Sequence, residues 1–359
     1  MIRNDDLGYP IVVAQSIRSS LLEFLKQRNI KRFVVLCDRN VADIARSVTG
    51  GIAGRAAVRT FALGERRKTF ETLRSVVEEL SAIGATRDTV IVGVGGGVAA
   101  DLFGFAAAIY MRGLPYIHVA TTLLAMVDAA IGGKTGVNLS RGKNLAGSFR
   151  DPLAVFAHID ALRSLSYAHL REGLAEMLKH AIIEGNELFE SLETLAPHPF
   201  SKWPWENVVA ESIKVKTMVV NDDRSERGAR ETLNLGHTFA HAIERASHYR
   251  VSHGAALSVG LRAAGLLALR TGRFSAAEHL RVLALLALLK LPLISDENAS
   301  TILAAMQSDK KKREGRLRFV LPRGIGDVEY GVNVTASQLR GVVKRCTADV
   351  TGSELSAKA

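Results

Sequence analysis

Three histidines lie close together in the second half of the sequence. His237 and His241 are four residues apart, so they share one face if the segment is helical, and His253 follows. Imidazole and carboxylate groups are good zinc ligands, and Glu244 lies nearly one turn further along. Spacing alone therefore predicts a metal site with His237 and His241 as the pair and Glu244 as a candidate third ligand. The alternative is that these are ordinary core or surface histidines.

Polar and charged side chains interrupt an apolar segment between residues 121 and 138. Asp128 stands between valine and alanine, and Lys134 stands between glycine and threonine; Lys143 and Asn144 follow shortly. Burying an unpaired charge is unfavourable, so these groups are either paired or directed at a ligand. The segment therefore indicates a polar site in which Asp128 is the stronger candidate. For Lys134, a solvated loop is the alternative.

A glycine-rich turn follows a β-branched run at residues 89–98. Glycine permits close backbone approach, and the amino end of a following helix offers N–H groups to a pyrophosphate. Gly93 and Gly95 fit the usual dinucleotide fingerprint, but Val98 occupies the position of its third glycine. The turn alone is therefore a weak indication of nucleotide binding, and a plain tight turn is the alternative.

Two further charged groups have ordinary explanations when each is taken alone. Glu176 and Lys179 are three residues apart, which favours a surface ion pair on a helix. The basic run at residues 309–313 is typical of a solvated face. Neither group would indicate a site without the rest of the sequence.

The elements that must hold these groups change character along the chain. In the first half, β-branched runs alternate with helical patterns, as in parallel βαβ units. We expect strands at residues 32–37, 89–94, 116–120 and 154–157 and a helix at 70–83. From about residue 170 the apolar spacing is helical, and helices are expected at 172–183, 208–220, 238–247, 255–270 and 276–289. The prediction is an α/β domain at residues 1–170 and a mainly α-helical domain at residues 171–359.

Composition restricts the class of protein. A chain of 359 residues with 47% hydrophobic residues can build two domains with sizeable cores. Cys37 and Cys346 lie far apart, which indicates neither a disulfide framework nor a thiolate zinc site. The net charge of +11 suits phosphorylated ligands, whereas dispersed basic residues and 6% aromatic content argue against nucleic acid. No segment resembles a signal peptide or a spanning helix, so we expect a cytoplasmic protein without membrane contact.

Taken together and in this order, the motifs resemble those of the 3-dehydroquinate synthase family of the sugar phosphate cyclase superfamily. Several ordered motifs are far more specific than any one of them, and they extend over nearly the whole chain. The matching segments are Gly64-Glu-Arg-Arg-Lys68, Gly173-Leu-Ala-Glu-Met-Leu-Lys179, Ser252-His-Gly254 and residues 95–101, 110–113, 121–138, 143–144, 233–244 and 309–311. The resemblance implies a Rossmann-like NAD-binding α/β domain followed by a helical domain that binds metal and substrate.

The resemblance also implies roles for individual residues. A divalent metal ion, zinc or cobalt, falls to Glu176, His237 and His253, which moves His241 from the metal to the substrate. NAD is implied to be held by Asp38, Glu65, Lys68, Gly96, Gly97, Asp101, Thr121, Thr122, Lys134 and Lys143. The residues implied to surround the substrate are Asp128, Lys134, Asn144, Lys179, Lys216, Arg230, Asn234, His241, Lys310 and Lys311. Arg112 is implied to reach the substrate phosphate from the partner subunit of a homodimer.

The implied reaction converts 3-deoxy-D-arabino-heptulosonate 7-phosphate into 3-dehydroquinate and phosphate. Its steps are a transient oxidation by NAD, phosphate elimination, re-reduction and intramolecular aldol closure. One alternative is a related cyclase acting on an aminated analogue or on sedoheptulose 7-phosphate; Asn234 and His241 argue against the latter, valiolone-type branch. More distant alternatives are a metal-dependent alcohol or glycerol dehydrogenase and an inactive binding or scaffold protein.

Overall fold

The computed structural model describes residues 1–359 except 51–57, 141, 225–227, 308–316 and 349–359. The chain forms two compact units. The first contains Met1–Leu170 and Pro204–Thr217, and the second contains Arg171–Trp203 and Met218–Ala359. The division expected from the sequence also falls after residue 170. It assigned residues 204–217 to the second domain, whereas these residues pack within the first unit.

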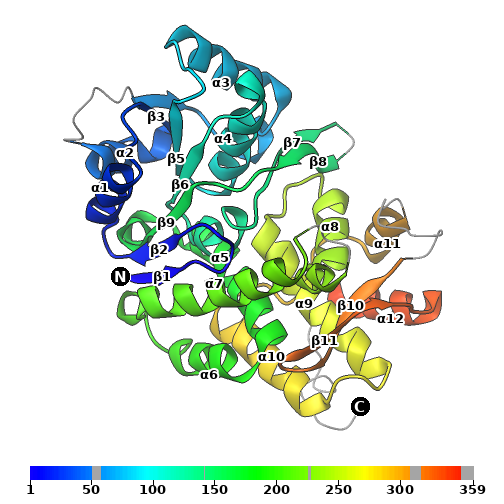
Figure 1. The fold of residues 1–359 in the computed structure, drawn as a ribbon. Coiled ribbons are helices and arrows are strands. Elements are labelled where there is room, and N and C mark those ends of the chain that lie inside the picture. Colours follow the sequence, from blue (N-terminus) through cyan, green and yellow to red (C-terminus); the bar gives the residue numbers. More distant parts are fainter. Residues whose placement is uncertain (51–57, 141, 225–227, 308–316, 349–359) are drawn as a thin grey trace. The chain divides into compact units, whose positions relative to one another are not determined.

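A seven-stranded sheet forms the centre of the first unit (Figure 1). Its strand order is β1-β2-β9-β6-β5-β3-β4, and all neighbouring strands are parallel except the antiparallel edge pair β1 and β2. The strands are β1 (Ile2–Asn4), β2 (Ile11–Ala14), β3 (Phe33–Asp38), β4 (Val58–Phe61), β5 (Val90–Gly95), β6 (Tyr116–Ala120) and β9 (Ala154–His158). The four predicted strands correspond to β3, β5, β6 and β9, with bounds that differ by at most one residue.

Helices cover both faces of this sheet (Figure 1). Helices α1 (Arg18–Gln27) and α2 (Ala42–Thr49) pack on one face, and α3 (Phe70–Ala82) and α4 (Gly97–Ile109) pack on the other. Alternate residues of β3 point to opposite faces, so Val35 and Cys37 join the first core and Val34 and Leu36 join the second. The parallel sheet is therefore buried on both sides. The predicted α/β architecture is confirmed.

A π-helical turn (Ala125–Ala129) and an antiparallel hairpin follow β6 in the chain. The hairpin consists of β7 (Lys134–Leu139) and β8 (Gly142–Phe149) and packs on α4. Gly104 of α4 makes this approach possible, because an added Cβ would lie 2.6 Å from Cγ2 of Thr135. The hairpin is absent from the elements predicted above. Lys134 is the first residue of β7 and so does not lie in a loop, but its side chain is exposed, as the solvated alternative expects.

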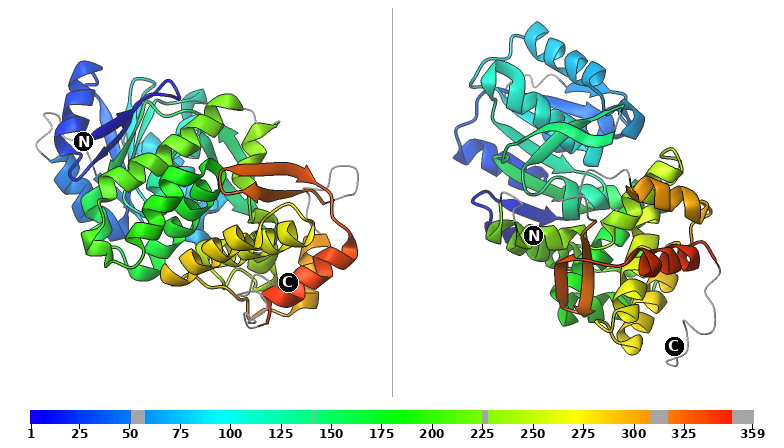
Figure 2. Two further views of the ribbon diagram at one scale, coloured as in Figure 1. Left: turned by 90° about the horizontal axis from the view of Figure 1, so that it is seen from below. Right: turned by 90° about the vertical axis from the view of Figure 1, so that its right-hand side faces the viewer.

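The second unit is mainly helical, as predicted. Its elements are α5 (Tyr167–Glu184, of which residues 167–170 belong to the first unit), α6 (Asn186–Leu195), α8 (His237–Ala246), α9 (His253–Arg270), α10 (Ala276–Leu288), α11 (Ala299–Gln307), α12 (Ala336–Cys346) and the hairpin of β10 (Phe319–Gly324) and β11 (Asp327–Val332). Helix α7 (Trp205–Asp222) contributes to both units. Helix α9 is almost entirely buried and contacts α8, α10, α12 and β10, and Figure 2 shows the orange-red hairpin beside the yellow helices.

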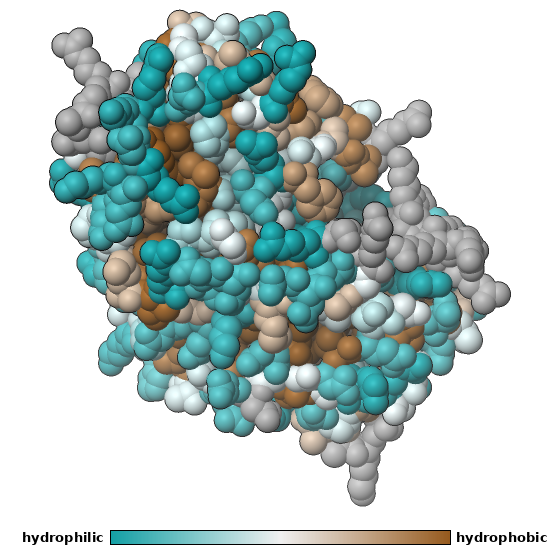
Figure 3. All heavy atoms as spheres, viewed as in Figure 1, coloured by the Kyte–Doolittle hydropathy of each residue, from teal (hydrophilic) through white to brown (hydrophobic). Residues whose placement is uncertain are grey.

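Hydrophilic side chains cover most of the face shown in Figure 3, and apolar residues appear there in small patches. Among the described residues, no helix combines the length and the apolar character that crossing a membrane requires.

Candidate cofactor and metal sites

The first candidate site lies at the carboxyl ends of the parallel strands in the first unit. A Cβ at Gly96, in the turn between β5 and α4, would lie 2.8 Å from Cγ2 of Thr122. Only glycine therefore allows this close approach. Asp38 ends the neighbouring strand β3, and the amide of Thr121 donates to the carbonyl of Gly95 at 3.0 Å. Four predicted cofactor residues thus meet where open parallel sheets usually bind nucleotides.

The Thr121 hydroxyl gives a separate indication that a ligand belongs at this turn. The residue is 2% exposed, and its oxygen has no hydrogen-bond partner among the described residues. Buried hydroxyl groups nearly always have such a partner. Gly97 is the first residue of α4, whose amino end offers backbone N–H groups to a phosphate. The residues present therefore fit a phosphate-containing nucleotide.

A buried lysine connects several of the predicted residues beside this turn. Lys68 is 3% exposed, forms an ion pair with Asp101 and donates to Oδ1 of Asn144 at 2.6 Å. Burial raises the pKa of the Asp101 carboxyl, and the Lys68 ammonium opposes this effect. Asn138 extends the network, because its Nδ2 donates to Oε1 of Glu65 at 2.8 Å and its Oδ1 accepts from the amide of Asn144 at 2.9 Å. Asn138 was not a predicted site residue, since its contacts depend on the hairpin.

The other predicted lysines of the first unit differ in their surroundings. Lys216 on α7 is 7% exposed, pairs with the Asp128 carboxylate and donates to the Asp128 carbonyl at 2.8 Å. Lys143 lies 3.8 Å from Oε1 of Glu65, and Lys134 is exposed at the start of β7. Asp128 and Lys216 therefore hold each other in place.

Arg112 lies on the surface in a strained segment of backbone. Its φ is 68°, and that of the preceding residue, Met111, is 48°, so two successive non-glycine residues are left-handed. Such conformations cost free energy and persist where the surrounding structure imposes them, often at functional sites. Arg112 is exposed, which suits its predicted role towards a partner subunit.

The second candidate site belongs to the second unit, where three helices bring an acid and two imidazoles together. Glu176 lies on α5, His237 begins α8 and His253 begins α9. Nε2 of His253 lies 2.9 Å from Oε1 of Glu176, and Nε2 of His237 lies 3.5 Å from the same oxygen. One ligand atom from each residue lies within 4.8 Å of the other two. This arrangement can hold a divalent metal ion and leave coordination positions open.

The groups around Glu176 carry charges that suit a cation-binding site. Burial would raise the pKa of the Glu176 carboxyl, but Lys179 at 2.5 Å and the two histidines hold that pKa well below its usual range. Burial opposes protonation of His253 as well, yet Glu176 and Glu244 together raise its pKa to about 10. The His253 ring thus lies between the carboxylates of Glu176 and Glu244, an arrangement that also favours a divalent cation at its Nε2 side. For His237, burial lowers the pKa, which favours the neutral form that binds metals.

Backbone contact selects the nitrogen that His237 presents to this centre. Its Nδ1 lies 3.2 Å from the carbonyl of Leu235. Because a carbonyl can only accept, Nδ1 carries the proton in this contact and Nε2 remains free to coordinate. The residue's position at the start of α8, after the left-handed Gly236, creates this contact.

The metal pair chosen from spacing differs from the group that the fold assembles. His241 does lie one turn beyond His237, with ring centroids 5.4 Å apart, but it is not among the grouped ligand atoms of the described residues. Glu244 lies with Oε1 3.5 Å from Nδ1 of His253, on the side of the ring away from Glu176. Glu176 of α5 and His253 of α9 complete the group. Residue spacing within α8 cannot predict them, because they lie on other helices.

The remaining predicted residues of the second unit lie just before α8 or outside the described residues. Arg230 is 2% exposed and donates from Nη1 to the carbonyl of Arg224 at 3.0 Å. Asn234 ends the short 3-10 helix Ala229–Asn234. Lys310 and Lys311 fall in the segment 308–316, outside the described residues.

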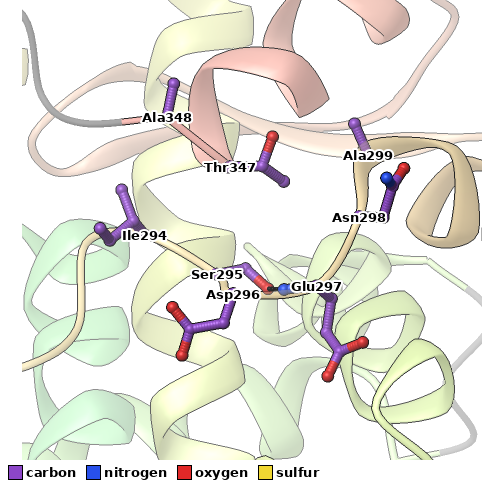
Figure 4. Close-up of a pocket in the computed structure, with 8 residues that line it drawn as sticks. All are labelled: Ile294, Ser295, Asp296, Glu297, Asn298, Ala299, Thr347 and Ala348. Atoms are coloured by element: carbon purple, nitrogen blue, oxygen red, sulfur yellow. Dashed lines mark hydrogen bonds between the residues drawn. The ribbon is translucent and has the colours of Figure 1, made fainter.

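A surface pocket of the second unit contains none of the predicted residues (Figure 4). It is lined by Ile294–Ala299 and by Thr347 and Ala348. Of its two carboxylates, that of Glu297 is already paired with Arg250 at 3.1 Å. We assign no function to this pocket.

Comparison with known proteins shows the family of the chain. The model of the 3-dehydroquinate synthase N-terminal domain matches residues 58–172, and that of the C-terminal domain matches residues 173–312. A relative named 3-dehydroquinate synthase, from Solibacter usitatus (strain Ellin6076), is 38% identical over 89% of this chain and 91% of its own length.

Two solved structures are similar to the chain in three dimensions. The 2-epi-5-epi-valiolone synthase ValA from Streptomyces hygroscopicus subsp. jinggangensis 5008, solved with NAD+ and Zn2+, has a TM-score of 0.85, with 28% identity and coverage of 94% of this chain and 96% of its own. A 2-deoxy-scyllo-inosose synthase complexed with carbaglucose-6-phosphate, NAD+ and Co2+ has a TM-score of 0.82, with 25% identity and coverage of 94% and 97%. The chain therefore belongs to the 3-dehydroquinate synthase family.

Proposed function

We propose that this protein is a 3-dehydroquinate synthase, a phosphate-eliminating lyase that uses NAD and one divalent metal ion. The observation that carries the proposal is the group of Glu176, His237 and His253 in a chain of this family. The substrate is 3-deoxy-D-arabino-heptulosonate 7-phosphate, and the products are 3-dehydroquinate and phosphate. The enzyme acts as a cytoplasmic homodimer.

The glycine turn of the first unit is the proposed NAD site. NAD supplies reversible hydride transfer, so the substrate is oxidised and later reduced without net consumption of the cofactor. The Thr121 hydroxyl and the amino end of α4 are available to its polar groups. The contacts among Lys68, Asp101 and Asn138 hold the surrounding loop and hairpin in place.

The metal ion, zinc or cobalt, is held by the three ligands of the second unit and polarises a substrate hydroxyl when bound. The protein residues around it then have two tasks. Lys179 neutralises the second oxygen of Glu176, and His237 is kept in the coordinating tautomer by the Leu235 carbonyl. Both tasks reduce the reorganisation that metal and substrate binding would otherwise require.

The substrate carries a phosphate and a carboxylate, and the proposed binding residues are chiefly cations and amides. Charge-assisted hydrogen bonds from such groups are strong and directional. The proposed set is Asp128, Lys134, Asn144, Lys179, Lys216, Arg230, Asn234, His241, Lys310 and Lys311. Arg112 is proposed to reach the phosphate bound by the other subunit, which explains an exposed arginine on a strained turn.

A cyclase acting on a different sugar phosphate is the second candidate function. It is favoured by the likeness to ValA and to the 2-deoxy-scyllo-inosose synthase. The two candidates share the NAD and metal chemistry and differ in the groups that the substrate presents to Asn234 and His241.

Phosphate release from purified protein separates these candidates. With NAD and zinc or cobalt supplied, we expect 3-deoxy-D-arabino-heptulosonate 7-phosphate to release phosphate with the highest kcat/KM, and a chelator to stop the reaction. Sedoheptulose 7-phosphate and the aminated analogue serve as comparison substrates. A higher kcat/KM with either of them would contradict the proposed substrate, and no phosphate from any of them would contradict the proposed reaction.

A further inference from the structure

We infer that two carboxylates outside the proposed ligand set, Glu172 and Glu244, position His253 for the metal. Glu244 orients the imidazole ring, and Glu172 binds both chain neighbours of the residue, Gly254 through its main-chain amide and Ser252 through its side-chain hydroxyl. The inference rests on the metal site of the proposed function. It concerns positioning residues, since neither carboxylate belongs to the proposed set of metal ligands.

The contact of Glu244 with the ring determines which nitrogen faces Glu176. Oε1 of Glu244 lies 3.5 Å from Nδ1 of His253, while Nε2 lies 2.9 Å from Glu176. Glu244 is 1% exposed, so water does not compete freely for its charge. A carboxylate that accepts from one imidazole nitrogen fixes the ring orientation and makes the other nitrogen a better ligand.

Glu172 acts on the backbone at the start of α9. Its Oε2 accepts from the amide of Gly254 at 2.7 Å, and its Oε1 accepts from the hydroxyl of Ser252. Ser252 is the N-cap of α9 but makes no side-chain capping bond of its own, so a residue of another helix provides the cap. The two bonded residues are the immediate neighbours of His253, one held by its main-chain amide and the other by its side chain.

The same contact fixes the distance between two proposed ligands. Glu172 and Glu176 are four residues apart on α5 and therefore lie on one face, about one turn from each other. A Cβ at Gly254 would lie 2.5 Å from Cα of Glu172, so only glycine lets α9 begin this close to α5. Helix α5 thus carries Glu176, a proposed metal ligand, and, one turn earlier, Glu172, which positions His253.

Metal affinity of single variants tests this inference. We would titrate metal-free protein with Co2+ and follow visible absorption, which reports both affinity and coordination, and measure NAD binding separately. Glu172→Ala and Glu244→Ala are expected to weaken Co2+ binding by about 10- to 100-fold. Glu172→Gln should recover most of the loss, because its amide oxygen still accepts from Gly254. Glu244→Ala should also change the cobalt spectrum, since the ring loses its orienting partner.

The control is Glu193→Ala, which removes a partly exposed ion pair between Glu193 of α6 and Arg281 of α10 in the same unit and should leave Co2+ affinity unchanged. Wild-type affinity in both Glu172→Ala and Glu244→Ala would overturn the inference. So would an equal loss of NAD affinity in all variants, including Glu172→Gln, because that result would indicate general unfolding. Wild-type protein that binds Co2+ but releases no phosphate would contradict the proposed function and leave the inference intact.

Discussion

Glu176 carries a buried charge in the second unit, and the groups around it are arranged to balance that charge. Lys179 contacts one carboxylate oxygen, and the two histidines approach the other. Because Glu244 lies on the far side of His253, two carboxylates enclose one imidazole. A metal ion would gain the favourable interactions that otherwise stabilise the proton on His253. Sequence spacing favours His241 as a metal ligand equally well. What distinguishes His253 is the set of charged groups around its ring.

Replacing His253 and His241 one at a time tests which of the two binds the metal ion. His253→Ala removes a proposed ligand and is expected to reduce bound zinc to a small fraction of one ion per chain. His241→Ala is the matched control, expected to keep about one zinc per chain and to lose turnover, since it is proposed to contact substrate. Metal analysis after exhaustive dialysis measures both. Stoichiometric zinc in His253→Ala together with its loss in His241→Ala would reverse the assignment.

The Lys68 and Asp101 pair stabilises the fold beside the proposed NAD site. Removal of one partner leaves the other charge buried, and such losses cost about 3 kcal/mol. We therefore expect Lys68→Met to lower the free energy of unfolding by about this amount and to weaken NAD binding. The double variant Lys68→Met with Asp101→Asn should regain part of the stability, because no uncompensated charge remains. Urea unfolding measures these values, and a Lys68→Met protein as stable as the wild type would contradict the argument.

For single residues, the sequence predicts which residue types form the sites better than it predicts which residues contact one another. Glu176, His237 and His253 are implied by resemblance to a family, while local spacing favours His237 and His241 as the pair, with Glu244 as a candidate third ligand. Asn138 and Glu172 gave no signal, because their contacts join segments that are distant in the sequence or fixed by the hairpin. Such contacts exist only after the helices and strands have packed.

The helices that carry the proposed metal ligands are held together by unusually close backbone approach. His237 begins α8 and His253 begins α9, and the two helices meet where Gly260 faces Gly236. A Cβ at Gly260 would lie 2.3 Å from the Gly236 carbonyl oxygen. The separation of these helices, and with it that of the imidazoles, therefore depends on the absence of a side chain.

Gly260→Ala should accordingly separate α8 from α9. We expect a loss of about 1–3 kcal/mol in the free energy of unfolding, as for other overpacked cores, and weaker Co2+ binding. NAD binding to the first unit is the internal control and should change little. An alanine variant with wild-type stability and Co2+ affinity would show that the close approach is not needed.

The predictability of the elements follows from their hydrophobic patterns. The interior strands β3, β5, β6 and β9 are continuous apolar runs, and the long helices of the second unit have clear helical spacing, so both were predicted. The hairpin of β7 and β8 was not predicted, since β8 is largely exposed and contains small residues without alternation. The hairpin of β10 and β11 contains Pro322 and two register shifts, which also obscure a strand pattern.

At the scale of the whole molecule, His118 and His279 are buried histidines that do not readily take up a proton. Burial lowers the pKa of His118 and of His279 to about 4, from an ordinary value of 6.5. Neither nitrogen of His279 has a hydrogen-bond partner among the described residues, so the neutral ring is strongly favoured there. Between pH 4 and 6.5 these two histidines therefore bind more protons in the unfolded chain than in the folded chain. Their contribution to stability is fully present above about pH 6.5 and is lost as the pH drops towards 4.

His279→Leu should reduce this acid sensitivity. Each histidine contributes at most on the order of 3 kcal/mol to the decline, and the leucine variant should show a shallower loss of unfolding free energy between about pH 6.5 and 4. His198→Gln, at an exposed position, is the control and should follow the wild type. Unfolding curves at several pH values measure the slopes. An unchanged slope in His279→Leu would contradict the assigned cause.

The proposed cyclase reaction requires that the protein uses NAD without consuming it. The most direct measurement incubates the purified protein with 3-deoxy-D-arabino-heptulosonate 7-phosphate, NAD and zinc or cobalt, and follows phosphate, 3-dehydroquinate and NADH together. We expect phosphate and 3-dehydroquinate to form in equal amounts while NADH does not accumulate. NADH that accumulates in step with substrate loss, without phosphate release, would identify a dehydrogenase and contradict the proposed cyclase.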